Sequence, residues 1–151
     1  MDEVGVYMSL SEPVKEFDGE LDRPENKQII EFLKQYQPSA HTDLVQLLVE
    51  STEDLPSMKF YCPDTDNHAY YLAHTPDGVI FAAAIGMSAL MYRLPKQSMS
   101  GAIVKGGEIF KEIGEPWVSF NPFWPDDEKK DQLNMSELKQ WSNLAYHHAI
   151  N

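Results

Sequence analysis

Residues 72–82 read LAHTPDGVIFA and hold the clearest turn signal in the chain. Pro76 presets the φ angle of the second turn position, and the Asp77 side chain can bond to nearby backbone groups. Gly78 can take the positive φ that closes a tight hairpin. The sequence therefore predicts two adjacent antiparallel strands at the centre of the fold.

The surrounding sequence predicts the other elements through apolar spacing and turn residues. Strands are expected over residues 68–75, 79–85, 89–94, 108–113 and 117–120, with a further short strand over residues 58–62. Helices are expected over residues 22–37, 42–51, 96–104 and 134–149, and Val45 and Val49 make a strand the alternative over residues 42–51. The expected order is helix, three strands, helix, two strands and helix, after an N-terminal helical extension.

These elements predict an α+β fold with two layers, in which helices cover one face of an antiparallel sheet of about five strands. The length of 151 residues indicates a single domain over residues 1–151, because domains commonly have about 100–200 residues. Residues 1–21 are predicted to be an acidic and partly irregular N-terminal segment within that domain.

The helix boundaries and buried faces are predicted from individual residues. Asp22 is expected to cap the first helix and Thr42 the second. Asn134 begins the last helix with Glu137 three residues on, a variant of the capping box. The expected buried faces are Ile29, Phe32, Leu33 and Tyr36 in the first helix, and Leu138, Trp141, Leu144, Ala145 and either His148 or Ala149 in the last.

Composition places the chain among ordinary globular proteins, with 42% hydrophobic and 24% charged residues. Cys62 is the single cysteine, so no intramolecular disulfide can form. No apolar run approaches the roughly 18 residues that a membrane helix requires. The first residues also lack the basic and then apolar layout of a signal peptide. We therefore expect a cytoplasmic protein without membrane contact.

The net charge is −12, and half of it falls in residues 1–31, which contain nine acidic and three basic side chains. Nucleic-acid binding depends on basic contacts to phosphate, so direct DNA or RNA binding is not expected. The acidity is interpreted as a source of solubility, and the alternative is a surface that attracts a basic protein partner.

Residues that could support catalysis or bind a metal lack the required spacing. Residues 64–75 begin like a calcium loop but have no glycine at the sixth position and no glutamate at the twelfth. Cys62 precedes His68 and His74, which makes a Cys/His nucleophile conceivable, although a buried thiol is the favoured interpretation. We therefore expect a protein that is not an enzyme and has no metal site and no cofactor.

An aromatic segment supplies the candidate interface residues. Residues 117–125 read WVSFNPFWP, and Pro122 cannot donate a hydrogen bond to a sheet, so the strand should end near Asn121. Phe123 and Trp124 lie beyond that end. Clustered exposed aromatic side chains tend to mark interfaces, so both residues are predicted at a partner or self-association surface. Burial beneath the last helix is the alternative.

A locally basic stretch supplies the second candidate site. Arg93 and Lys96 begin it, and Glu108 is the only acidic residue between positions 91 and 111. These charges are expected to neutralise part of the acidic N-terminal segment. The alternative is that Arg93 and Lys96 contact an anion or a partner.

Several motifs in the second half of the chain resemble the TfoX N-terminal domain family. They are DGVIFA at residues 77–82, Gly86, ALMYRL at residues 89–94, GEPWV at residues 114–118, and LKQW at residues 138–141 followed by Ala145 and Ala149. The family's Met-Phe-Gly-Gly strand is replaced here by MKFYCP at residues 58–63. The resemblance covers residues 68–149 and implies a fold similar to the secretion-chaperone-like α/β sandwich.

The resemblance brings no catalytic residue to this chain, and it does not imply transcriptional regulation. We therefore expect a bacterial protein–protein interaction or regulatory module, with a homodimer as one form of association. An acidic immunity protein that inhibits a basic toxin is an alternative, as is a secretion-chaperone-like binder. The secretion-chaperone-like alternative depends on acidity and analogy of fold alone.

Overall fold

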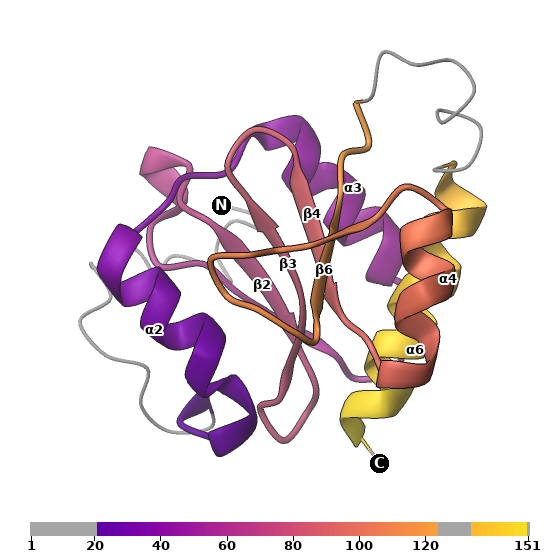
Figure 1. Ribbon diagram of the computed structural model, residues 1–151. Helices are drawn as coiled ribbons and strands as arrows, with labels where there is room; N and C mark the ends of the chain where they lie inside the picture. Colours follow the sequence, from indigo (N-terminus) through magenta and orange to yellow (C-terminus); the bar gives the residue numbers. More distant parts are fainter. Residues whose placement is uncertain (1–20, 124–133, 151) are drawn as a thin grey trace.

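In the computed structural model, residues 21–123 and 134–150 are described, and they form one antiparallel sheet with helices packed against it (Figure 1). The helices are α2 (Lys27–Tyr36), α3 (Thr42–Thr52), α4 (Met99–Val104) and α6 (Met135–Ile150). The strands are β1 (Lys59–Tyr61), β2 (Tyr71–His74), β3 (Ile80–Ile85), β4 (Ala89–Arg93), β5 (Glu108–Ile109) and β6 (Trp117–Phe120). Short 3₁₀ helices are η2 (Pro24–Asn26), η3 (Thr65–Asn67) and η4 (Lys96–Ser98).

The strand order across the six-stranded sheet is β1-β2-β3-β4-β6-β5, and each neighbouring pair is antiparallel. The predicted α+β class and antiparallel sheet are therefore confirmed. The structure forms four strands before α4, because residues 59–61 pair with β2 as an edge strand. Among the described residues, no helix combines the length and the apolar character needed to cross a bilayer.

The predicted central hairpin is formed by β2 and β3. Gly78 has a φ of 95°, and its N–H donates to the Thr75 carbonyl at 3.0 Å. The register then passes from Ala73 opposite Ala82 to His74 opposite Ile80, which leaves Phe81 as an extra residue. A bulge of this kind turns two successive side chains to the same face. Phe81 and Ala82 accordingly pack in the same apolar cluster.

Both faces of the sheet are covered, and every residue of β3 is buried. One cluster joins Leu44 of α3 and Leu138 of α6 to the strand face that carries Phe81. The other joins Ile29, Phe32 and Leu33 of α2 to Leu72, Ile80, Ala83, Ile85 and Met91. Helix α2 thus lies on the face opposite α3 and α6, whereas helices were expected on one face (Figure 1). The apolar residues of β3 point to both faces, so each face needs a cover.

Two predicted helix caps are wrong. Asp22 does not cap α2, which begins at Lys27 after the 3₁₀ turn η2 and has no side-chain cap. His41 takes the place predicted for Thr42, since its Nδ1 accepts a hydrogen bond from the Asp43 N–H at 3.1 Å. The third prediction is confirmed, because the Asn134 side chain accepts a hydrogen bond from the Glu137 N–H at 2.9 Å.

The helical faces are buried as predicted except at two positions. Trp141 is 7% exposed, but Tyr36 is 58% exposed and Leu144 is 41% exposed. Tyr36 ends α2, and its ring lies 5.0 Å from that of Phe32 instead of reaching the sheet. Leu144 lies roughly 120° around the helix axis from Leu138, which takes it off the buried stripe.

Candidate functional site

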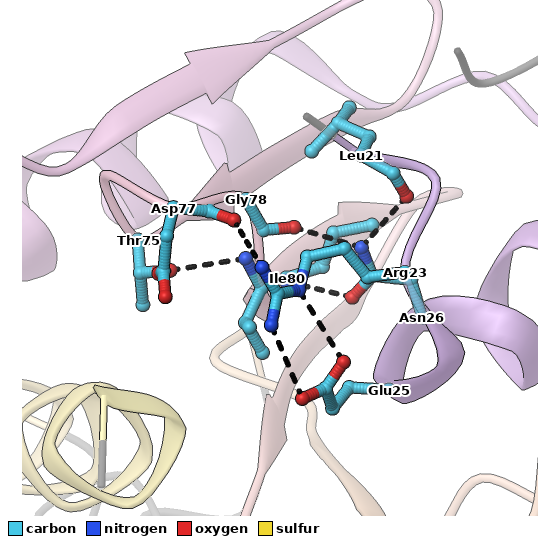
Figure 2. Close-up of polar contacts among 9 residues, drawn as sticks. Leu21, Arg23, Glu25, Asn26, Thr75, Asp77, Gly78 and Ile80 are labelled. Atoms are coloured by element: carbon cyan, nitrogen blue, oxygen red, sulfur yellow. Dashed lines mark hydrogen bonds and ion pairs between the residues drawn. The ribbon is translucent and has the colours of Figure 1, made fainter. Parts of the chain in front are cut away.

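A buried asparagine ties the segment before α2 to the central hairpin (Figure 2). Asn26 is fully buried, and its Nδ2 donates to the carbonyl oxygens of Leu21 at 2.9 Å and Gly78 at 2.8 Å. Its Oδ1 accepts a hydrogen bond from the Ile80 N–H at 2.8 Å. The amide thus uses both donors and its acceptor within the chain, so this side chain holds the fold together and is not offered to a ligand.

The surface side of the same hairpin is held by Arg23, whose Nη1 donates to the Asp77 carbonyl at 2.9 Å (Figure 2). Its Nε lies 3.4 Å from a carboxylate oxygen of Glu25. The Thr75 hydroxyl donates to the Asp77 carboxylate at 2.6 Å, and this hydrogen bond is the largest cause of the lowered pKa of Asp77. We interpret the whole cluster as a structural clamp on the turn.

Cys62 lies in an environment that disfavours the reactive thiolate. The side chain is fully buried, and its Sγ donates to the Ala69 carbonyl at 3.7 Å. Burial raises the pKa of the Cys62 thiol to about 11. His74 is also buried, and its Nδ1 lies 2.9 Å from the Thr75 carbonyl. This geometry favours the buried-thiol interpretation over a Cys/His nucleophile.

We expect native Cys62 to resist iodoacetamide at pH 8. A pKa of about 11 leaves roughly one thiol in a thousand as thiolate at that pH, and burial also blocks the reagent. Mass spectrometry should show little alkylation of the native chain after an hour and complete alkylation in 8 M urea. Equal rates in both conditions would contradict the buried thiol.

Three buried hydroxyl groups meet where α3 and α6 cross β4. The Ser142 hydroxyl donates to Ser51 Oγ at 3.2 Å, and Ser51 Oγ lies 3.4 Å from the Tyr92 hydroxyl. Ser51 also donates to the Leu48 carbonyl at 3.1 Å. Burial raises the pKa of Tyr92, so it stays neutral. These residues join helices to sheet, and they include no group that would act as a general base near neutral pH.

An exposed surface patch forms at the end of β6, and we call His41, Met87 and Phe123 the β6-end patch. Met87 is 69% exposed and Phe123 is 44% exposed. The Phe123 ring centroid lies 6.5 Å from that of His41. The backbone N–H of His41 donates to the Gly86 carbonyl at 2.9 Å, which places His41 beside the turn that carries Met87. Three segments distant in sequence thus meet here.

The predicted interface residues are only partly described by the structure. Phe123 is held at the surface by a hydrogen bond from its N–H to Asn121 Oδ1 at 3.0 Å. Trp124 lies outside the described residues. The interface therefore stays a prediction, with Phe123 exposed as that prediction requires.

Arg93 and Lys96 stand near the other end of the sheet, where Arg93 of β4 pairs with Trp117 of β6. Arg93 is half-buried and Lys96 is exposed. Within the described parts of the chain, neither side chain makes a hydrogen bond or an ion pair. Burial lowers the pKa of Arg93, and the charge of nearby Glu25 opposes that shift. The anion or partner site stays a prediction.

Sequence reasoning missed two members of the β6-end patch. The sequence pattern singled out neither Met87 nor His41 as a candidate site residue. Their proximity depends on the bridge between Ala40 and Gly86, a pairing between residues far apart in the chain. An apolar residue at the tip of a turn was the one signal available in the sequence.

The chain matches no protein-family model, no curated protein and no solved structure. The resemblance to the TfoX N-terminal domain therefore stays a prediction. Among the residues that the structure describes, no three histidine, cysteine or acidic side chains gather in a way that could hold a metal ion.

Proposed function

We propose that this chain is a non-enzymatic, cytoplasmic protein–protein interaction module related to the TfoX N-terminal domain. The observation that carries the proposal is the β6-end patch, where Phe123 exposes apolar surface beside His41 and Met87 exposes it at the turn to which the His41 backbone is hydrogen-bonded. Clustered apolar and aromatic side chains at a surface commonly become the buried centre of an interface. Aromatic residues and methionine are both enriched at such centres.

The charge of the chain narrows the class of partner. A net charge of −12 repels phosphate backbones and favours a basic protein. A second copy of the chain would bring two acidic surfaces together, so a homodimer must gain its stability from apolar contact at the patch. Inhibition of a basic toxin and chaperoning of a secreted protein are the alternatives, and each of them also requires a protein partner.

We expect the double change Met87→Ser with Phe123→Ser to weaken association at least tenfold while moving the melting temperature by less than about 3 °C. Both side chains are exposed, and exposed substitutions usually change stability by no more than about 0.5 kcal/mol. Light scattering over a concentration series measures self-association. Pull-down from the source organism with mass spectrometry identifies a partner, whose affinity for the purified variants then follows by calorimetry.

The matched control is Val104→Ser, because Val104 is 79% exposed on α4, outside the β6-end patch. The control should associate as the unchanged chain does. An equal loss in the control would indicate general surface hydrophobicity instead of a specific patch. A large fall in melting temperature without any change in association would make Phe123 a core residue and contradict the proposal.

A further inference from the structure

A second surface feature lies on the sheet face that carries α2. A groove of about 240 Å³ separates the outer side of this helix from the segment between β5 and β6. It is lined by Gln28, Glu31, Phe32, Gln35, Tyr36, Glu112 and Ile113, and we call it the α2 groove. The helical members recur three or four residues apart, so they form one continuous stripe.

The shape of the groove is fixed by contacts across it. Gln28 Nε2 donates to the carbonyl oxygens of Ile113 at 3.2 Å and Glu115 at 3.3 Å, which ties the helix to the segment opposite. The Phe32 ring also packs edge-on against that of Phe110, with centroids 5.5 Å apart and planes at 88°. These contacts join the two walls, so the groove exists before any ligand arrives.

The polar chemistry of the groove is negative. Glu31 comes from α2 and Glu112 from the opposite wall, and both are exposed. Lys27 and Lys34 share the helix with Glu31, and Lys111 precedes Glu112, yet among the described residues none of these lysines forms an ion pair with either glutamate. Within residues 21–123 and 134–150, neither carboxylate makes an ion pair or a side-chain hydrogen bond. Two carboxylates lining one groove create a potential that attracts a cation.

An exposed aromatic ring accompanies these carboxylates. Tyr36 is 58% exposed, and its ring leans on that of Phe32 at a centroid distance of 5.0 Å and an interplanar angle of 41°. Phe32 is in turn held by Phe110, so the tyrosine projects from a packed base. A cation over a phenol ring is attracted to its π face, and this attraction adds to the pairing with carboxylate.

We propose that the α2 groove receives an arginine side chain from a basic protein partner. A guanidinium group is planar, so it can stack on Tyr36 while its edge donates to carboxylate oxygens of Glu31 or Glu112. A lysine ammonium would be attracted by the carboxylate charges, but it could not stack on the ring or donate two parallel hydrogen bonds to a carboxylate. The inference rests on the proposal that the chain binds a protein, and it uses a different surface from the β6-end patch.

The test uses the full chain and two capped peptides, acetyl-Gly-Ser-Arg-Ser-Gly-amide and the same peptide with citrulline in place of arginine. Citrulline keeps the shape of arginine and removes its charge. Titrations followed by ¹⁵N NMR should show the arginine peptide shifting the amide signals of residues 28–36 and 110–114 with millimolar affinity. The citrulline peptide should bind at least tenfold more weakly.

The variant Glu31→Gln with Glu112→Gln should lose at least tenfold in affinity for the arginine peptide, and Tyr36→Leu should lose several-fold. The matched control is Glu53→Gln with Asp66→Asn, which removes the same charge from exposed positions outside the groove. The control should keep the affinity within twofold. An equal loss of affinity in the control, or NMR signal shifts spread over the whole chain, would indicate general charge attraction. Either result would contradict a specific arginine site in the α2 groove.

The two proposals can fail separately. One outcome is that a captured protein binds the Glu31→Gln, Glu112→Gln variant as tightly as the unchanged chain. That result would support the proposed interaction module and contradict the proposed arginine site in the α2 groove. If the arginine peptide binds in the α2 groove but no protein associates with the chain, arginine binding by the groove is supported and the proposed interaction module is contradicted.

Discussion

Replacing Asn26 with alanine is expected to lower the free energy of unfolding by about 3–5 kcal/mol. The change leaves the Gly78 carbonyl and the Ile80 N–H without their buried partner, whereas the Leu21 carbonyl still accepts the Arg23 N–H at 3.0 Å. Each unsatisfied buried group costs about 1–3 kcal/mol, and some relaxation reduces the sum. The hairpin at the centre of the sheet should therefore lose the support of the segment before α2.

Urea denaturation followed by circular dichroism measures this loss. Asn143→Ala is the matched control, because Asn143 is exposed and makes one hydrogen bond, from Nδ2 to the Lys139 carbonyl. Its expected cost is at most about 0.5 kcal/mol. Asn26→Asp keeps the shape but loses both donors, so it should be nearly as harmful at pH 7. A cost below about 1 kcal/mol for Asn26→Ala would show that water replaces the lost partners.

Replacing Trp141 with alanine is expected to lower the free energy of unfolding by roughly 3–5 kcal/mol, the range for large aromatic truncations in cores. Trp141 is 7% exposed and stacks on Phe120 of β6, with ring centroids 5.6 Å apart and planes at 27°. Its buried Nε1 has no hydrogen-bond partner among the described residues. Trp141→Phe should accordingly cost much less, since it keeps the stacking and removes an unpaired polar atom.

Denaturant titration of both variants checks this order. Leu144→Ala provides a control on the same helix, because Leu144 is 41% exposed, and its cost should stay below about 1 kcal/mol. If Trp141→Phe proved as damaging as Trp141→Ala, the indole nitrogen would have to be paired in solution. A cost below about 1 kcal/mol for Trp141→Ala would place this helix face outside the core.

The elements that sequence predicted best depend on neighbours in the chain. The central hairpin is one example, because Pro76, Asp77 and Gly78 are turn-forming residues that can be recognised without knowledge of the distant contacts that also hold the turn. The position of α2 was not predictable in this way. Strand β3 reads IFAAAI, so its two faces are alike in polarity, and periodicity cannot show which face takes which helix. The bulge at Phe81 also interrupts the alternation, because Phe81 and Ala82 pack on the same face.

The candidate surfaces were predictable only in part, for the same reason. The exposure of Phe123 follows from the strand end near Pro122, whereas His41 and Met87 join it through a bridge between distant segments. The α2 groove was missed because Tyr36 has the spacing of a buried residue. It lies at the last position of its helix, where the sheet no longer covers it, and a periodic pattern contains no information on where the opposing surface ends.

The two outermost strands of the sheet limit how copies of this protein can assemble. Strand β1 has three residues and β5 has two, so each edge offers few backbone groups to an incoming strand. Short edges are one way in which proteins prevent edge-to-edge growth of their sheets. A continuous sheet across two molecules would therefore gain little from these strands. Complexes of this protein should be held by side chains, and their specificity should change with single surface substitutions.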